Sequence, residues 1–411
     1  MNDRAYTRAQ RKGLLASTLA QTISSTSVLA LAPLAALLQS DFALTRAELG
    51  MVLGAGGVGA LLVGIPAGWL TDLLGVRRVV FTGILVGGFS FCLLSLTGSL
   101  LLALLVMVCA GLGTGVIPAA TTKAIMYWFP ARVRGTAMGI KQTGFPLGGA
   151  LTAATLPAVA LAWGGWRPAV LAVGVATITV GLLYFWLYAE HPHQTFAQPG
   201  KPTGLAMLRL VYTDPRILAL AMLGFCYGFN LSTLSGYLSL YLQETLGMEI
   251  VLAGAYLMGA QVSGAAGRLV LGMISDRFFA GRRTPVLFAV TALNGVVALA
   301  FGWLMPLAPA WAQTALILAF GVVAVGWSSL YHVFVGETAG RERAGTAVGL
   351  CLMVVAGGGV VGPPVFGLIV DVSRSYPLAW ASQAVIALIG VALIAGLRHE
   401  SRLAPAGRLA D

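Results

Sequence analysis

The chain has 411 residues, of which 58% are hydrophobic and only 9% are charged, and its mean hydropathy is +0.88. Ordinary globular proteins are about 25% charged. This composition excludes a soluble globular protein and predicts a polytopic membrane protein.

Apolar segments long enough to cross a membrane recur along the whole chain. A spanning helix needs about 20 apolar residues. The first such segment follows a basic flank like that of a signal peptide, but it is as long as a full span, so we expect it to be retained. We predict twelve helices, at residues 13–38, 47–74, 79–97, 99–127, 135–162, 167–189, 216–245, 250–279, 284–305, 309–336, 344–371 and 377–397.

The distribution of basic residues predicts the orientation of these helices. With the N-terminus placed inside, three of the 25 Lys and Arg fall within helices, three fall in external loops, and the other 19 fall in cytoplasmic loops or tails. This asymmetry follows the positive-inside rule. We therefore expect an inner-membrane protein with both termini in the cytoplasm. The net charge of +11 then needs no nucleic-acid partner.

The chain consists of two halves that repeat each other. The polar interval 191–215 indicates a cytoplasmic linker between an N-terminal six-helix domain, 1–190, and a C-terminal one, 216–411. Two landmarks recur in the same order in both domains. GWLTD at 68–72 returns as GMISD at 272–276, and RGTAMG at 134–139 returns as AGTAVG at 344–349. Parallel six-helix repeats are one architecture of secondary transporters, whose substrate binds at the midplane between the repeats.

The segment between the second and third helices carries glycine, aspartate and paired arginine in a fixed pattern: Gly68, Asp72, Gly75, Arg77 and Arg78. This pattern resembles the cytoplasmic signature of the major facilitator superfamily, and the resemblance covers essentially the whole chain. The basic residue that usually follows the aspartate is Leu73 here, whereas the second copy keeps it as Arg277.

The resemblance implies an all-α membrane protein with twelve transmembrane helices in two pseudo-symmetric six-helix bundles. It also implies that the signature latches helices and loops during transport, which makes the following residues candidate gating residues: Asp72, Arg77, Arg78, Asp276 and Arg277. A carboxylate at a helix end can accept a charge-assisted hydrogen bond from an arginine, and such a pair can break when a gate moves. The alternative is that both aspartates only anchor helix ends at the interface.

Arg268 is the most informative charge within a predicted helix. It precedes Asp276 by eight residues, which places it roughly 12 Å deeper than the helix end. Intramembrane charges are costly and usually functional. Gln261 and Gly264 share its helical face at spacings of three and four, so this face is polar and small. We predict that Arg268 binds an anionic substrate; the alternative is a structural bond to backbone carbonyls or a helix end.

Two lysines also fall within helices. Lys141 lies seven residues beyond Arg134, roughly 10 Å into the fifth helix, and Gln142 follows it. We predict that Lys141 assists the substrate site, although its long side chain could instead reach back to the interface. Lys123 lies near the cytoplasmic end of the fourth helix, where snorkelling competes with a role in a cytoplasmic gate.

No Asp or Glu lies in the middle of a predicted helix, so the deep cations have no obvious acidic partner in the sequence. Unpaired buried charge is costly. A bound anion would neutralise it, and the planar fork of arginine suits a carboxylate. The simplest interpretation is a small anionic substrate.

An arginine two turns before the aspartate of the eighth helix resembles the monocarboxylate porters and the oxalate/formate antiporters of the superfamily. In those proteins this arginine binds the carboxylate, which implies the same role for Arg268. The oxalate exchangers have a second cation in the eleventh helix, which is missing from residues 344–371. Lys141, in the pseudo-equivalent fifth helix, is the candidate substitute.

Polar and aromatic side chains on other helices complete the candidate site: Gln21, Gln142, Asn230, Tyr237, Gln261 and Tyr331. Aromatic residues in membrane helices also serve as packing or interfacial anchors. His332 is a candidate proton carrier if transport is coupled to protons. We expect neither a metal site nor a disulfide, because the four cysteines lie singly in apolar segments.

Three function classes compete at this stage. The first is a secondary transporter of small organic anions that works by proton symport or by anion exchange. We expect such a protein to need no cofactor and to be a monomer in the lipid bilayer. The second is a drug/proton antiporter, whose fifth-helix signature resembles Gly144–Gly149, although the helices lack a deep acid. The third is an enzyme or receptor, but the sequence contains neither a catalytic cluster nor a nucleotide-binding motif. We therefore predict the first.

Overall fold

The computed structural model describes residues 7–191, 213–340 and 344–403, and every regular element in this part is a helix. The predicted linker at 191–215 lies mostly outside these residues. The first half contains α1 (Arg8–Leu29), η1 (Ala32–Leu34), α2 (Ala35–Phe42), α3 (Arg46–Leu74), α4 (Val76–Leu94), α5 (Leu100–Gly115), α6 (Ile117–Trp128), α7 (Ala131–Gln142), α8 (Gly144–Ala162) and α9 (Trp166–Leu187). The second contains α11 (Pro215–Leu246), α12 (Ile250–Phe278), α13 (Arg283–Leu304), η2 (Met305–Leu307), α14 (Ala310–Val325), α15 (Ser328–Ala339), α16 (Ala344–Ser373) and α17 (Tyr376–Leu403).

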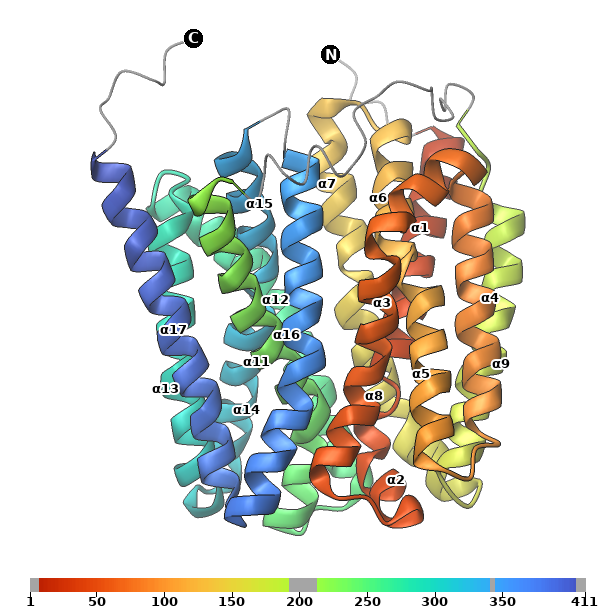
Figure 1. Ribbon diagram of the computed structural model, residues 1–411, viewed down its shortest axis with the longest axis vertical. Coiled ribbons are helices and arrows are strands. Elements are labelled where there is room, and N and C mark those ends of the chain that lie inside the picture. Colours follow the sequence, from red (N-terminus) through yellow and green to blue (C-terminus); the bar gives the residue numbers. More distant parts are fainter. Residues whose placement is uncertain (1–6, 192–212, 341–343, 404–411) are drawn as a thin grey trace.

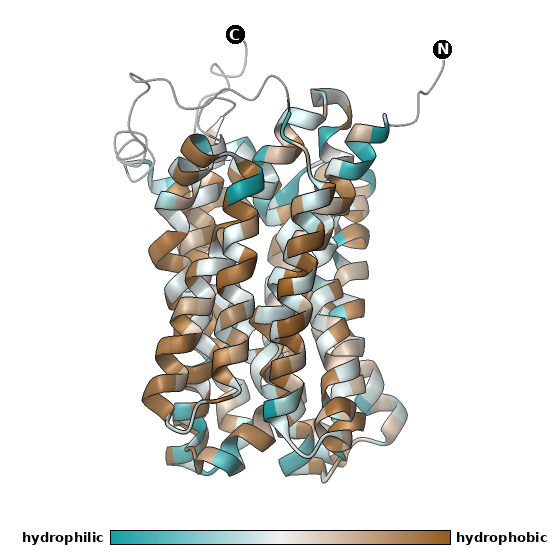
Figure 2. Ribbon diagram, turned by 90° about the vertical axis from the view of Figure 1, so that its right-hand side faces the viewer, coloured by the Kyte–Doolittle hydropathy of each residue, from teal (hydrophilic) through white to brown (hydrophobic). Residues whose placement is uncertain are grey.

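The two sets of helices stand side by side, with α3 and α16 facing each other where they meet (Figure 1). The start of α1 and the end of α17 lie at the same end of the bundle, which we call the terminal face. The start of α3 and the end of α11 lie at the opposite end, the distal face. Hydrophilic residues gather at these two faces and hydrophobic residues cover the length between them (Figure 2).

The prediction of twelve spanning helices is confirmed, because twelve helical segments are long and apolar enough to cross a membrane. The first begins at Arg8, not at residue 13, because Thr7 and Gln10 form a capping box. The Thr7 hydroxyl accepts from the Gln10 amide at 3.3 Å, and the Gln10 side chain accepts from the Thr7 amide at 3.0 Å. Hydropathy does not detect this polar start.

Several spans are interrupted, and proline explains two of the interruptions. Proline has no N–H, so it cannot bond the carbonyl four residues earlier. Pro118, at the start of α6, cannot donate to the carbonyl of Thr114, and the Ser24 hydroxyl donates to that carbonyl at 3.3 Å. Pro146, near the start of α8, leaves the carbonyl of Gln142 without its helical donor in the same way.

Candidate functional site

The interface between α3 and α16 opens toward the terminal face. The residues of α3 that face α16 follow one another at helical spacing: Gly50, Gly54, Gly57, Gly64 and Gly68. A Cβ atom at Gly50 would lie 2.4 Å from the Pro363 carbonyl oxygen, and one at Gly64 would lie 3.2 Å from Met353 Cγ. At Gly68, one turn further, nothing lies within 4 Å. The helices therefore separate beyond Gly64.

The interface between α12 and α7–α8 follows the same course. One face of α12 carries four residues at helical spacings of seven, seven and four: Gly254, Gln261, Arg268 and Gly272. A Cβ at Gly254 would lie 2.5 Å from the Ala153 carbonyl, and one at Gly149 would lie 3.1 Å from Gln261 Cδ. A Cβ at Gly272 would meet nothing within 4 Å. Arg268 is thus the last residue on this face of α12 to contact the other half. Both interfaces are therefore closed toward the distal face.

Arg268 bonds the carbonyl that Pro146 leaves free. Its Nη1 donates to the Gln142 carbonyl at 3.3 Å, and its Nε donates to the Val325 carbonyl at 3.3 Å. These carbonyls lie at the C-terminal ends of α7 and α14, where the helix dipole favours a cation. The guanidinium also lies over the ring of Phe145, 5.8 Å from its centroid. Arg268 therefore joins two interrupted helices that belong to different halves.

The contacts of Arg268 leave it able to bind a ligand. An arginine has five N–H donors, and two of them make the bonds above, both at the long end of the normal range. The described part of the chain offers it no carboxylate within ion-pair distance. The side chain is half-buried. A planar anion can accept from the remaining donors without first displacing an acidic side chain.

Lys141 and His332 lie on the interrupted helical segments whose carbonyls Arg268 bonds. Lys141 is 1% exposed, and its Nζ donates to the Pro118 carbonyl and the Thr122 hydroxyl, each at 3.4 Å. Lys141 directly precedes Gln142, whose carbonyl Arg268 bonds, and the ring of His332 lies 6.5 Å from that of Trp327, two residues after Val325. The Nε2 atom of His332 is buried without a hydrogen-bond partner among the described residues. Lys141 and His332 therefore lie on the two interrupted helical segments that Arg268 joins, and no acid is paired with these three basic side chains in the described spans.

Three predicted amide side chains are buried with an unpaired oxygen. Gln21 lies against α8, where its Cβ would be 3.0 Å from a Cβ at Gly144. Gln261 donates to the Ser235 hydroxyl at 3.2 Å. The side-chain oxygens of Gln21, Asn230 and Gln261 have no donor among the described residues. Buried polar atoms normally have a partner, so these oxygens can accept from water or a bound solute.

The two predicted tyrosines both donate their hydroxyls to main-chain carbonyls. The Tyr237 hydroxyl donates to the Arg46 carbonyl at the distal face, because Tyr237 lies two turns nearer that face than Asn230. The Tyr331 hydroxyl donates to the Leu220 carbonyl at 2.8 Å, and its side chain is fully buried. Gln142 contributes its main-chain carbonyl, whereas the prediction concerned its side chain.

Comparison with known proteins agrees with this architecture. Residues 17–363 match the sequence profile described as Major Facilitator Superfamily. The chain belongs to this superfamily of membrane transporters. A bacterial homologue of the human lysosomal transporter Spinster, solved in an inward-facing and occupied conformation, superposes with a TM-score of 0.78 at 16% identity, covering 96% of this chain and 98% of that one. The resemblance noted in the sequence is confirmed at the level of the superfamily, and with it the assignment to transporters, not enzymes.

Three bacterial relatives align with most of the chain. The first is a probable sulfoacetate transporter of Cupriavidus necator, 29% identical over 88% of this chain and 87% of its own length. The second is the 3-(3-hydroxy-phenyl)propionate transporter of Escherichia coli, 28% identical over 89% of this chain and 88% of its own length. A hexuronate transporter of Bacillus subtilis is 22% identical over 90% of this chain and 88% of its own length.

The first superfamily signature makes its contacts within the N-terminal half. Asp72 pairs with Lys123 of α6, so the ammonium of Lys123 meets a carboxylate and does not snorkel to the interface unpaired. Arg77 does not pair with Asp72; it donates to the Phe185 carbonyl at 2.5 and 2.8 Å, and its amide donates to Glu190 at 2.7 Å.

The second signature uses a different arginine from the one predicted. Asp276 pairs with Arg283, the first residue of α13, which also lies 3.6 Å from Glu337. Arg277 and Arg78 are exposed. The chain folds back at Gly281, whose positive φ of 75° suits glycine, and this turn brings Arg283 to Asp276. Spacing along the sequence did not reveal this pairing.

Proposed function

We propose that this protein transports small organic anions by alternating access, and that Arg268 binds the anionic group. The observation that carries the proposal is the position of Arg268. It is the last contact residue on the α12 interface, it has spare N–H donors, and its described partners are two carbonyls at 3.3 Å. A carboxylate bound bidentately there would use Nη2 together with Nη1 or Nε, so it would compete with one of the two carbonyls. Competition with the Gln142 carbonyl, which links the halves, would couple binding to the movement of the halves.

Lys141, His332 and the amides of Gln21, Asn230 and Gln261 would form the rest of the site. Lys141 adds a second positive charge, and the unpaired amide oxygens suit donors on the substrate or its water shell. Together they favour a carboxylate or a similar oxyanion over a lipophilic cation. The drug/proton alternative would need a deep acid, whereas every Asp and Glu in the described spans lies near a helix end.

The named relatives support an anionic substrate. Sulfoacetate, hexuronate and hydroxyphenylpropionate all carry an acid group, and the chain aligns with most of the length of each of these transporters. We further propose that the domains 1–190 and 216–411 rock about the site, that the terminal face lies in the cytoplasm, and that the protein resides in the bacterial inner membrane, consistent with the distribution of basic residues.

Uptake by proteoliposomes tests the substrate and the ligand together. A panel of labelled sulfonates, carboxylates and lipophilic cations would be compared for wild type, Arg268→Ala, Arg268→Lys and the control Arg167→Ala, which removes an arginine at the distal face. We expect anion uptake in wild type and the control, none in Arg268→Ala, and weak uptake in Arg268→Lys, whose ammonium cannot bind bidentately. Undiminished anion affinity in Arg268→Ala would contradict the proposal.

The same liposomes distinguish two modes of coupling. Under proton symport, an inwardly directed proton gradient accelerates uptake into empty vesicles. Under anion exchange, unlabelled anion loaded inside accelerates uptake and a proton gradient does not. His332→Gln separates these modes further, because a proton-carrying histidine is needed only in the first.

A further inference from the structure

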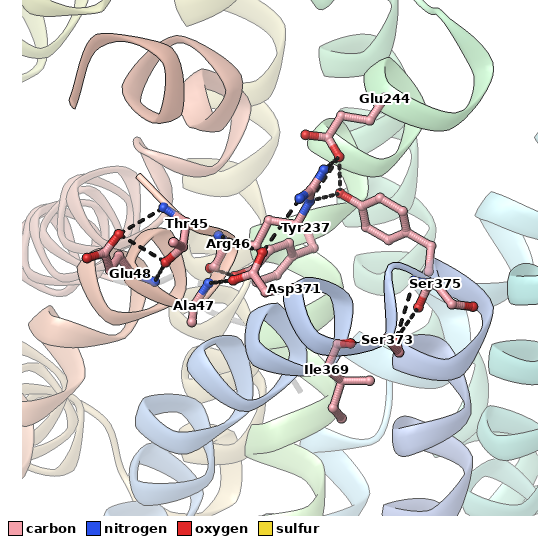
Figure 3. Close-up of polar contacts among 11 residues, drawn as sticks. Thr45, Arg46, Ala47, Glu48, Tyr237, Glu244, Ile369, Asp371, Ser373 and Ser375 are labelled. Atoms are coloured by element: carbon pink, nitrogen blue, oxygen red, sulfur yellow. Dashed lines mark hydrogen bonds and ion pairs between the residues drawn. The ribbon is translucent and has the colours of Figure 1, made fainter. Parts of the chain in front are cut away.

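Arg46, the first residue of α3, joins the two halves at the distal face (Figure 3). Its Nη2 lies 2.7 Å from Glu244 Oε2 of α11, and its Nη1 lies 3.5 Å from Asp371 Oδ1 of α16. The Tyr376 hydroxyl donates to the same Glu244 oxygen at 2.6 Å. Three elements of the C-terminal half therefore meet one side chain of the N-terminal half.

The main chain of α3 is held by the same group of residues. The Asp371 carboxylate accepts from the amide of Arg46 at 3.2 Å and from the amide of Ala47 at 2.8 Å. Tyr237 donates to the Arg46 carbonyl. The first N–H groups of a helix lack partners within the helix, and its dipole favours a carboxylate there. Asp371 thus caps a helix of the other half. We call Arg46, Tyr237, Glu244, Asp371 and Tyr376 the distal cluster.

No comparable set of bonds joins the halves elsewhere in the described chain. Apart from the bond from Arg268 to the Gln142 carbonyl, every hydrogen bond between described residues of the two halves involves Arg46 or Ala47. The α8–α12 interface, on the opposite side of the site, carries no ion pair between described residues and closes by small-residue packing, as at Gly254 against Ala153.

We infer that Arg46 is a gating residue whose bonds to Glu244 and Asp371 keep the distal face closed. These bonds must break when the distal face opens, because they link α3 to helices that then move away from it. The pairs are partly exposed, with 22 to 29% of each side chain accessible. Exposed ion pairs are weak individually, so the cluster can hold this conformation without locking it. Which substrate binds at Arg268 has no bearing on this role.

Distances between spin labels on the two halves test the inference directly. Ser40 on α2 and Leu307 on η2 are exposed at the distal ends of opposite halves. In a variant with the four native cysteines replaced by alanine, labels at Ser40→Cys and Leu307→Cys would report opening by pulsed electron paramagnetic resonance in nanodiscs. Arg46→Ala and Asp371→Asn should each raise the ratio of the long-distance to the short-distance population about fivefold, the effect of about 1 kcal/mol.

Two further variants guard against a merely structural effect. Arg167→Ala breaks an ion pair with Asp41 at 2.7 Å that lies at the distal face but within one half, so its distance distribution should match that of wild type. Arg46→Lys keeps the charge and should restore most of the closed population. An unchanged distribution in Arg46→Ala and Asp371→Asn, or an equal change in Arg167→Ala, would overturn the gating role.

Discussion

The guanidinium of Arg268 donates to the Gln142 main-chain carbonyl across the boundary between the two halves, at 3.3 Å. The carbonyl accepts this bond because Pro146, four residues later, has no N–H to offer it. An anion that binds Arg268 through Nη1 therefore competes with a contact between the halves. A proline in α8 and an arginine in α12, 122 residues apart, together decide how the candidate site is linked to the movement of the domains.

Pro146→Ala should raise the affinity for the anion. The alanine N–H can bond the Gln142 carbonyl within the helix, so Arg268 loses this competing partner. A hydrogen bond of this kind contributes about 1 kcal/mol, so the Kd should fall roughly fivefold. Binding to purified protein, measured by calorimetry with the transported anion, checks this. Pro157→Ala, in the same helix but further from Arg268, is the matched control and should leave the Kd unchanged. An unchanged Kd in Pro146→Ala would mean that the carbonyl does not compete.

Substrates with two acidic groups should bind more tightly than substrates with one. Arg268 and Lys141 supply two positive charges at mid-depth, and the described spans place no acid beside them. Sulfoacetate and malonate should therefore compete for uptake better than acetate and lactate. Lys141→Gln should reduce this preference about fivefold, the effect of losing about 1 kcal/mol of pairing. If diacids compete no better than monoacids in wild type, the assignment of two positive charges to the site is wrong. Transport of the monoacids would still support anion transport.

Two glycine variants on one face of α3 should act in opposite directions. Gly50→Ala places a Cβ 2.4 Å from the Pro363 carbonyl, so it should open the distal face. Gly68→Ala meets open space in this conformation and should obstruct only the closing of the terminal face, where α3 and α16 must approach. The spin-label pair at Ser40 and Leu307 measures both. A shift toward the open distal face in Gly68→Ala would show that α3 and α16 do not close together there.

Asp276→Asn should slow transport without weakening substrate binding. The change removes the ion pair with Arg283 on the terminal face, far along α12 from Arg268. Because this pair holds α12 to α13 in the conformation that opens toward the terminal face, turnover should fall several-fold while the Kd of the anion stays constant. Glu337→Gln, which removes the looser contact to Arg283 at 3.6 Å, should have a smaller effect. A raised Kd in Asp276→Asn would instead connect this residue to the binding site.

Local patterns predicted much of the fold. Each spanning helix is recognisable from about 20 neighbouring residues, because the bilayer core requires length and hydrophobicity from every span by itself. The repeated signatures, the distribution of basic residues and the depth of Arg268 are likewise properties of short segments. The capping box at Thr7 could also have been recognised, since threonine followed by glutamine three residues later is a helix-start signal.

The partners of these residues required the tertiary structure. Arg46 was one of three basic residues in external loops, and only the packing of α11 and α16 supplies the two carboxylates that compensate a cation at a helix N-terminus. Tyr237 matched the spacing of a site residue, yet the depth of α11 places its hydroxyl on Arg46. The sequence by itself determined twelve helices and an arginine deep within one of them. Only the tertiary structure decided which carbonyls and carboxylates meet these side chains, because those contacts join segments whose separation along the chain carries no local signal.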